Sequence, residues 1–365
     1  MINKYSKYAV FDNEKKSLSL AETEIPPLKD FEILVRVDYT TLCKSDILTF
    51  TGKRNEKNPT ILGHEICGKI VGFGDKTVRT DLRNNSIELG DRITWAIYAS
   101  DPSDPMSQKG IPQKAADLFK YGHEQITNSS HLHGGLSEYI ILRPNTPVIR
   151  PIVNLPLPVL SVVNCAVATV AGALRIAGNV SGFTVVIAGA GMLGVIACAM
   201  AKTKGATHII AIDIKEERLE ISKAFGATHT IQIESLKNDL YLSNWLSNNN
   251  LQINCLIDFS GEPSTIDLLL TQLSVGGTAV FIGSTFPQNN ISINAETIVR
   301  KIWTIKGLHN YNETDFMEAV KFVESHHQDF PLASLIREGF NLDTCELAFK
   351  VAIEEHPFRV GIALN

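Results

Sequence analysis

The chain has 365 residues, of which 44% are hydrophobic and 20% charged, and its formal net charge is −5. This length exceeds one ordinary core and favours two domains. The mild acidity, with no long Lys/Arg run, argues against nucleic-acid binding, because phosphate recognition needs a basic surface. Small molecules are therefore the expected partners. Residues 1–16 hold no apolar core of the length of a signal peptide, so a cytoplasmic location is expected.

The first 150 residues or so have the pattern of an antiparallel sheet with long loops. The segment FEILVRVDYTTL at residues 31–42 alternates in the manner of a half-buried strand. Gly, Pro and Asp turns recur throughout this region. An antiparallel-rich domain is the expectation for this part of the chain.

Chemically active residue types gather in two segments of this first domain. Cys43 is followed by Ser45 and Asp46, while His64 and Glu65 lie between glycines. Taken singly, a Cys is most often a small buried apolar residue, and a His a core or surface residue. Together they indicate a metal site. Two thiolates and one imidazole around an open position suit a catalytic zinc, since four protein ligands would exclude substrate.

The segment at residues 155–174 carries no charge and is long enough to cross a bilayer. Polar residues and prolines interrupt it, and Arg175 follows directly; the interruptions are Pro156, Pro158, Ser161, Asn164 and Thr169. A buried core segment is therefore expected. The six cysteines are scattered through the chain, and no disulfide is expected in a cytoplasmic protein.

The middle of the chain alternates strand and helix signals. Short apolar runs typical of buried strands occur at residues 184–190, 208–213, 255–261 and 278–284. Helical patterns separate them, which predicts an α/β fold with a doubly wound parallel sheet.

Two later segments also have strand patterns. The last residues, 358–365, are predicted to form a strand that joins the first domain. Residues 291–299 look strand-like and are expected to pair across a two-fold axis, which favours a homodimer or homotetramer.

A glycine-rich loop follows the strand at 184–190 and fits the pattern G-x-G-x-x-G. Its members are Gly189, Gly191, Met192, Leu193 and Gly194. The first glycine permits the tight turn, the second lets the backbone approach a pyrophosphate, and the third allows the helix to pack on the strand. Asp213 closes the next strand, where a carboxylate accepts from ribose hydroxyls and repels a 2′-phosphate. This favours NAD over NADP, although Lys215 and Arg218 soften the repulsion. The alternative is a glycine turn without a ligand.

With these motifs, the chain resembles the zinc-dependent medium-chain alcohol dehydrogenase family over nearly its full length. The resemblance rests on the two metal segments, Gly90-Asp91, the glycine loop with Asp213, and NCAVATVAGAL at 164–174. It implies a GroES-like catalytic domain beside a Rossmann dinucleotide-binding domain. The implied boundaries are residues 1–166, 167–309 and 310–365, the last returning to the catalytic domain.

The resemblance also implies the roles of individual residues. Zinc would be held by Cys43, His64 and Cys165, with Glu65 either binding the metal directly or standing behind it. Asp46 would orient His64 and raise its basicity. The zinc would make the alcohol more acidic, and the nicotinamide would accept a hydride.

The remaining implied roles concern the proton and the cofactor. Ser45 would pass the alcohol proton outward, although Leu48 stands where many relatives continue this relay through a histidine. Thr169 would lie near the nicotinamide. Lys44 and Arg359 would bind cofactor phosphate, or each could equally be a solvated surface charge.

One loop departs from the family pattern. Relatives commonly carry a second, structural zinc on four cysteines spaced C-x2-C-x2-C-x7-C. This chain has Asp101, Asp104, Ser107 and Ala115 at that spacing. No tetrahedral sulfur site can form there, and two carboxylates with a hydroxyl make a poor calcium site. We expect one zinc per chain and a loop held by proline stiffness and packing.

Short segments at 110–114 and 118–124 are similar to a family branch associated by name with phosphonate catabolism. A phosphonate-bearing alcohol would need cationic groups, which Lys44, Lys53 or Arg54 could offer. The alternative is that they are cofactor contacts or surface charges.

Two other functions are considered beside zinc- and NAD-dependent alcohol oxidation. One is a zinc-independent NAD(P)H reductase of the same fold, against which the three metal ligands argue. The other is a non-catalytic nucleotide-sensing protein, against which Ser45 and Asp46 argue.

Overall fold

The computed structural model describes residues 3–128, 131–233 and 239–364. The chain forms two compact units. Unit 1 comprises Met1–Ala168 and Asn312–Asn365, and unit 2 comprises Thr169–Tyr311. The chain thus leaves unit 1, builds unit 2 and returns to complete unit 1.

Unit 1 is built around a mostly antiparallel sheet with the strand order β16-β17-β3-β4-β5-β9, in which β8 also pairs with β3. Two small sheets, β1-β2 and β6-β7, accompany it. Its strands are β1 (Tyr5–Asp12), β2 (Ser17–Glu24), β3 (Ile33–Leu42), β4 (Glu65–Phe73), β5 (Arg92–Trp95), β6 (Tyr98–Ala99), β7 (Phe119–Lys120), β8 (Tyr139–Leu142), β9 (Val148–Ile149), β16 (Ile336–Asn341) and β17 (Arg359–Ala363).

Strand β3 is buried on both faces, so the expectation of a half-buried strand is wrong. Alternate residues enter different apolar clusters: Val35 and Val37 pack into one, and Leu34 and Leu42 into another. The neighbouring strands β17, β4 and β8 take its hydrogen-bonding edges, and the two apolar clusters cover its two faces. Apolar/polar alternation at 31–42 therefore underestimates its burial.

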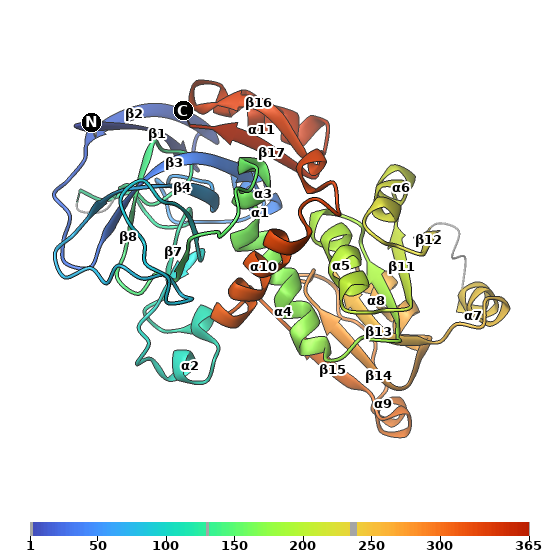
Figure 1. Cartoon of the computed structure of the whole chain (residues 1–365). Helices are drawn as coiled ribbons and strands as arrows, with labels where there is room; N and C mark the ends of the chain where they lie inside the picture. The colour runs from blue at the N-terminus through green and yellow to red at the C-terminus, as the bar shows by residue number, and fades with distance from the viewer. Residues whose placement is uncertain (1–2, 129–130, 234–238, 365) are drawn as a thin grey trace. The chain divides into compact units, whose positions relative to one another are not determined.

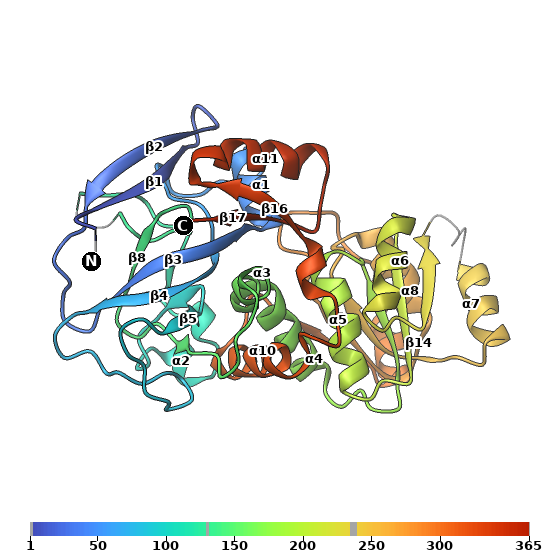
Figure 2. The same ribbon diagram turned by 45° about the horizontal axis from the view of Figure 1, so that its top comes forward.

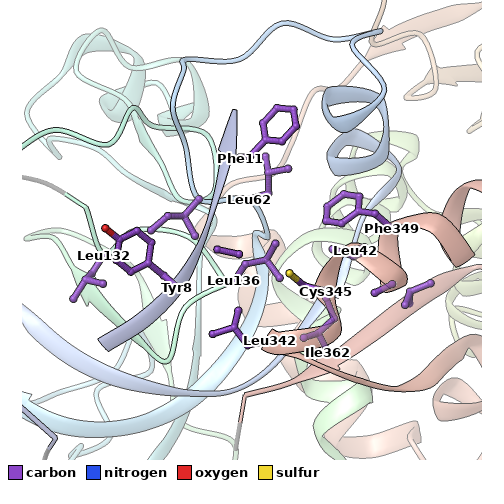
Figure 3. Close-up of a cluster of buried hydrophobic side chains, with 14 of the residues drawn as sticks. Tyr8, Phe11, Leu42, Leu62, Leu132, Leu136, Leu342, Cys345, Phe349 and Ile362 are labelled. Atoms are coloured by element: carbon purple, nitrogen blue, oxygen red, sulfur yellow. The ribbon is translucent and has the colours of Figure 1, made fainter. Parts of the chain in front are cut away.

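The C-terminal return completes this sheet, and the predicted last strand is confirmed. Strand β17 pairs antiparallel with β3, with Val360 opposite Leu42. Figures 1 and 2 show β16, β17 and α11 (Cys345–Glu354), in red, beside the blue N-terminal strands. Figure 3 shows the shared core, in which Phe349 of α11 gathers with Phe11 of β1 and with other buried apolar side chains.

The apolar segment begins in the helical elements of unit 1 and continues into α4 (Ala168–Ala177), at the start of unit 2. The helical elements of unit 1 are α1 (Lys44–Phe50), α2 (Pro105–Gln108), α3 (Leu157–Ser161), a π-helical turn (Val163–Val167), α10 (Glu313–His326), α11, and 3-10 helices at Pro112–Lys114, Leu332–Leu335 and Leu342–Thr344. Leu157–Ala177 is long and apolar enough to cross a membrane, but 83% of its apolar window is buried inside the structure. The predicted buried core segment is confirmed.

Unit 2 is a parallel sheet with the strand order β12-β11-β10-β13-β14-β15, which confirms the predicted doubly wound α/β fold. The order reverses between β10 and β13, where such sheets bind ligands. Its elements are α4 (Ala168–Ala177), β10 (Thr184–Ala188), α5 (Met192–Thr203), β11 (His208–Asp213), α6 (Glu216–Ala224), β12 (His229–Gln232), α7 (Asp239–Asn248), β13 (Ile253–Asp258), α8 (Pro263–Thr271), β14 (Leu273–Phe281), α9 (Ala295–Lys301) and β15 (Thr304–Gly307).

The strand expected at residues 291–299 is wrong. Residues 295–301 form helix α9, because the side chain of Asn294 accepts a hydrogen bond from the backbone N–H of Glu296 at 2.8 Å and caps the helix. This segment therefore offers no strand that could pair across a two-fold axis. That the protein forms a homo-oligomer stays a prediction, which a measurement of its mass in solution would test.

Candidate metal centre and dinucleotide loop

Four side chains from distant parts of unit 1 come together at one point. The ligand atoms of Cys43, His64, Glu65 and Cys165 all lie within 4.8 Å of one another. Within the part of the chain that the structure describes, this is the cluster of His, Cys, Asp and Glu side chains found close enough together to hold a metal ion. Their spacing in the chain, up to 122 positions apart, means that the fold and not local sequence assembles them.

Asp46 joins the two segments that carry Cys43 and His64. Its Oδ2 accepts the backbone N–H of Cys43 at 2.9 Å, where β3 ends and α1 begins. Its Oδ1 accepts the backbone N–H of Gly63 at 3.2 Å and lies 3.3 Å from Nδ1 of His64. The carboxylate is buried, so these contacts fix both segments and leave Nε2 of His64 for a metal.

A π-helical turn carries Cys165 and is fixed by its neighbour. The buried Asn164 donates from Nδ2 to the carbonyl of His64 at 3.1 Å and to that of Trp95 at 2.8 Å. Single π-turns inside helices are frequent at functional sites because they redirect side chains. Asn164 thereby ties the Cys165 turn to the backbone of His64.

Glu65 stands beside the three other groups with its oxygens occupied by protein donors. Arg359 donates from Nε to Oε2 at 2.7 Å and from Nη2 to Oε1 at 2.9 Å. Thr41 donates its hydroxyl to Oε2 at 2.7 Å. Both charged side chains are buried. Both oxygens of Glu65 therefore accept from protein donors, and the choice between direct metal binding and a position behind the other ligands stays a prediction.

The sequence did not predict that Arg359 pairs with Glu65. The side chain of Arg359 is 5% exposed, and its Nη2 also lies 3.5 Å from Sγ of Cys43. The alternative of a solvated surface charge is therefore wrong. A contact with cofactor phosphate stays a prediction, now for a group already engaged with Glu65. Lys44, in contrast, is exposed at the start of α1.

The two thiols differ in acidity. A hydrogen bond from Cys165 lowers the pKa of Cys43 well below its ordinary value, against the opposing effect of burial, and the charge of Arg359 lowers it further. The same hydrogen bond, with burial, raises the pKa of Cys165. Cys43 is therefore the more readily ionised of the two thiols. Two sulfurs and one imidazole in a pre-arranged, largely buried group match the donor set that zinc prefers.

The remaining residues expected at this site lie on two helices. Ser45 is half-buried in the first turn of α1, and Leu48 follows on the same helix. Thr169 is buried in α4. Cys67 is fully buried in β4, where Sγ donates to the carbonyl of Leu157 at 3.8 Å, in keeping with a core thiol.

The glycine loop of unit 2 joins β10 to α5. A Cβ at Gly189, whose φ is +92°, would come 2.9 Å from the backbone N of Ser260. A Cβ at Gly194 would come 1.9 Å from the carbonyl oxygen of Gly189, so helix and strand touch there. A Cβ at Gly191 would meet only Nη1 of Arg218, at 4.0 Å, so this side of the loop is open. Met192 and Leu193 begin α5, whose N-terminal N–H groups favour an anion.

Asp213 is the last residue of β11, and its carboxylate binds the backbone of the glycine loop. Its Oδ2 accepts the backbone N–H of Ala190 at 2.7 Å, and its Oδ1 accepts that of Lys215 at 2.9 Å. Each carboxylate oxygen keeps a second lone pair. A ribose contact through these lone pairs stays a prediction.

Carboxylates hold the loop that lacks the structural cysteines. Asp104 caps α2, accepting from the N–H of Met106 at 2.7 Å, and its second oxygen accepts from Ala116 at 3.1 Å. Asp117 accepts the N–H of Asp101 at 2.9 Å. These bonds join the two ends of the loop, so the expectation of proline stiffness and packing is incomplete. Ser107 lies 3.5 Å from the hydroxyl of Ser100, and Ala115 is buried.

A further histidine that the sequence reading did not select lies on the metal group. The ring of His123 is 4.9 Å from that of His64, centroid to centroid. The preceding Gly122 has φ +77°, and a Cβ there would come 2.5 Å from the carbonyl oxygen of Gly63. The glycine therefore permits the segment to lie directly on Gly63 and His64. The only local signal is a Gly-His pair, which is too common to predict this contact.

Comparison with known proteins gives a consistent result. A family model described as "Alcohol dehydrogenase GroES-like domain" matches residues 29–152, and one described as "Zinc-binding dehydrogenase" matches residues 193–325. The chain is 25% identical over 334 residues to an L-threonine 3-dehydrogenase of Protochlamydia amoebophila, covering 89% of this chain and 90% of that one.

Solved structures share the fold over the full length. An alcohol dehydrogenase of Thermotoga maritima superimposes with a TM-score of 0.92 at 24% identity, covering 100% of both chains. A benzyl alcohol dehydrogenase of Acinetobacter calcoaceticus gives a TM-score of 0.85 at 22% identity, again over 100% of both chains.

Proposed function

The chain belongs to the zinc-type medium-chain dehydrogenase family, and on that premise we propose that it transfers a hydride between an alcohol or polyol, or its carbonyl product, and NAD. One observation carries the proposal. The ligand atoms of two thiols, an imidazole and a carboxylate all lie within 4.8 Å of one another in unit 1. Zinc bound there would make an alcohol more acidic and polarise a carbonyl, while the nicotinamide would accept or return the hydride.

The protein's own groups have definite tasks in this chemistry. Cys43, His64 and Cys165 would hold the metal with one position open to substrate. Asp46, at 3.3 Å from Nδ1 of His64, would keep that nitrogen protonated and direct Nε2 to the metal. Ser45 would accept the alcohol proton at Oγ and pass it on. Leu48 offers no group to continue the relay, so the proton would leave through cofactor hydroxyls or water.

The cofactor preference follows from Asp213. A carboxylate at the end of β11 repels a 2′-phosphate, and its two oxygens accept the backbone N–H groups of Ala190 and Lys215, which hold it at the loop. We infer a preference for NAD over NADP. Thr169 is proposed to contact the nicotinamide side of the cofactor.

The metal content is proposed to be one zinc per chain. Carboxylates stand at two of the four sulfur positions of the loop at 101–115: Asp101 accepts the backbone N–H of Ser103, and Asp104 accepts those of Met106 and Ala116. Such a loop needs no metal to close it.

The test is a panel of alcohols, polyols and carbonyls with NAD and NADP, on protein whose zinc has been counted. The proposal expects zinc-dependent NADH formation, which Cys165→Ser abolishes together with the bound zinc. Cys67→Ala, which removes a buried thiol from β4 outside the metal group, should keep both. Reduction of activated double bonds by zinc-free protein would instead favour the reductase alternative. Nucleotide binding without turnover of any substrate would favour the nucleotide-sensing alternative.

A further inference from the structure

Two histidines lie side by side on the parallel sheet of unit 2. His208 is the first residue of β11, and His229 is the first residue of β12, the edge strand of the sheet (Figure 1). His229 lies opposite Ile210 in the parallel register. Because alternate residues of a strand share a face, His208, Ile210 and His229 all face the same side of the sheet. The two imidazoles therefore start from neighbouring strands and project from one face.

The two rings are placed as two ligands of one ion would be. Their centroids are 5.6 Å apart, and their planes are inclined by 48°. With metal–nitrogen bonds of about 2.0–2.1 Å, two imidazoles on one ion have ring centres roughly 4.5–6.5 Å apart, depending on the angle at the metal. The observed separation falls inside that range. Both histidines are partly exposed, so an ion can reach them from solvent.

The hydrogen bonds around His229 leave one of its ring nitrogens able to bind a metal. The hydroxyl of Thr228 accepts the backbone N–H of Ile209 at 2.8 Å and donates its one proton to the carbonyl of Ile209 at 3.1 Å. Its remaining lone pair faces Nδ1 of His229 at 2.9 Å, so Nδ1 carries the ring proton and Nε2 keeps its lone pair. Histidines that bind metals typically have this arrangement, in which the other ring nitrogen donates to a fixed acceptor.

The indole of Trp245, on α7, holds the same ring from a second direction. It meets the imidazole of His229 edge-on, with centroids 5.5 Å apart and planes inclined by 88°. Trp245 itself packs against the apolar cluster that contains Ile210 and Ile231. A ring that is already held by a hydrogen bond and by an aromatic contact loses little side-chain entropy when it binds an ion. His229 is therefore a pre-arranged ligand.

We propose that His208 and His229 form a second metal site, which binds a transition-metal dication such as Ni²⁺, Cu²⁺ or Zn²⁺ and joins the edge strand β12 to β11. Imidazole suits these ions, whereas Mg²⁺ prefers oxygen ligands. Two protein ligands leave the other coordination positions to water, so the ion exchanges and a chelating column removes it. The predicted count of one tightly held zinc per chain is unaffected. The site lies within unit 2 and does not depend on the proposed function.

The test is a titration of Ni²⁺ into zinc-loaded protein without a histidine tag, followed by calorimetry and by tryptophan fluorescence. Trp245 is one of three tryptophans and lies beside the site, so paramagnetic Ni²⁺ should quench part of the fluorescence, saturably and with one ion per chain. Trp245→Phe should still bind Ni²⁺ in the calorimeter but lose most of that quenching. Mg²⁺ should produce neither signal. Absence of saturable Ni²⁺ binding would overturn the inference.

Variants assign the ion to the two histidines. His208→Gln and His229→Gln each remove one ligand and should weaken Ni²⁺ binding at least about tenfold, while Thr228→Val removes the acceptor for Nδ1 and should weaken it about 10- to 100-fold. His131→Gln is the matched control, because it removes a partly exposed imidazole from unit 1, and it should leave the binding unchanged. Equal Ni²⁺ affinity in the wild type and in both His208→Gln and His229→Gln would contradict the site.

Hydrogen exchange tests whether the ion joins the two strands. Ni²⁺ should slow the exchange of the backbone N–H groups of β12 in the wild type, because an ion that bridges β11 and β12 opposes opening of the edge strand. The same concentration of Ni²⁺ should change nothing in His208→Gln, which keeps only one of the two ligands. Slower exchange in both proteins, or in neither, would contradict a bridge between the strands.

Discussion

Arg359 and Glu65 form a buried, two-point ion pair across 294 positions of sequence, with N–O distances of 2.7 and 2.9 Å. Glu65 directly follows the metal ligand His64, and Arg359 opens the last strand, β17. The C-terminal return of the chain therefore supports the metal group directly. A buried guanidinium here also lies against the thiol of Cys43 and favours its ionised form.

Breaking this pair from one side should be costly. Arg359→Met leaves the Glu65 carboxylate buried without its main partner, and we expect unfolding in urea to show a loss of about 3–5 kcal/mol. The double variant Glu65→Gln with Arg359→Met should lose clearly less than the sum of the single losses. Arg92→Met is the control, because its partner Asp38 keeps Arg36 at 3.8 Å. Unchanged unfolding of Arg359→Met would show that the pair does not hold the site.

Asp46 should act through zinc affinity. Asp46→Asn keeps the size of the side chain but removes the charge that faces Nδ1 of His64, so affinity should fall about 10- to 100-fold in competition with a chelator. Asp81→Asn is a matched control, since Asp81 is a buried carboxylate that accepts from Arg83 and Asn85 in a turn. It should alter stability without altering zinc affinity. Equal zinc affinity in wild type and Asp46→Asn would remove the orienting role.

Two glycines with nearly the same backbone conformation isolate the contact on His64. Gly122 and Gly110 have φ of +77° and +75°, so alanine should cost each about 1–2 kcal/mol in backbone strain. A Cβ at Gly110 meets nothing within 4 Å, whereas one at Gly122 meets the carbonyl oxygen of Gly63 at 2.5 Å. Gly122→Ala should therefore also lower zinc retention after dialysis, and Gly110→Ala should not. Similar retention in both variants would contradict close packing at the metal group.

The loop at 101–115 should depend on pH through Asp104. Hydrogen bonds from the N–H groups of Ala116 and Met106 lower the pKa of Asp104 below its ordinary value of 3.8. A carboxyl group with a lowered folded-state pKa stabilises the fold above its unfolded pKa, and this contribution disappears as pH falls through the lowered value. Hydrogen exchange in the loop should therefore be slower in wild type than in Asp104→Asn at pH 6. The difference should vanish in acid below the lowered pKa. A pH-independent difference would contradict the prediction.

Local signals in the sequence were sufficient for the Rossmann unit. Strand β11 has the predicted bounds of 208–213, and the glycines at 189, 191 and 194 take the positions that the loop pattern requires. The periodicity of apolar residues and the spacing of the glycines determine these features, and both can be recognised within about thirty residues of chain. Residues 291–299 were misread because their apolar alternation outweighed a helix-capping Asn294.

The surroundings of the metal group were harder to predict from the sequence. The convergence of Cys43, His64 and Cys165 was expected only from the family resemblance, because no periodicity links these positions. The Arg359–Glu65 pair and the packing of His123 on His64 have no local signature at all. They depend on how β17 joins β3 and on where a loop can approach Gly63, which are properties of the tertiary fold.

X-ray absorption at the zinc edge, on protein with its metal counted, tests the central claim most directly. The account predicts one zinc per chain, with two sulfur neighbours at about 2.3 Å and one imidazole nitrogen at about 2.0–2.1 Å. Cys43→Ser or Cys165→Ser should lower the sulfur count by one or lose the metal. Two zincs per chain, a four-sulfur shell, or a sulfur count unchanged in both variants would contradict it.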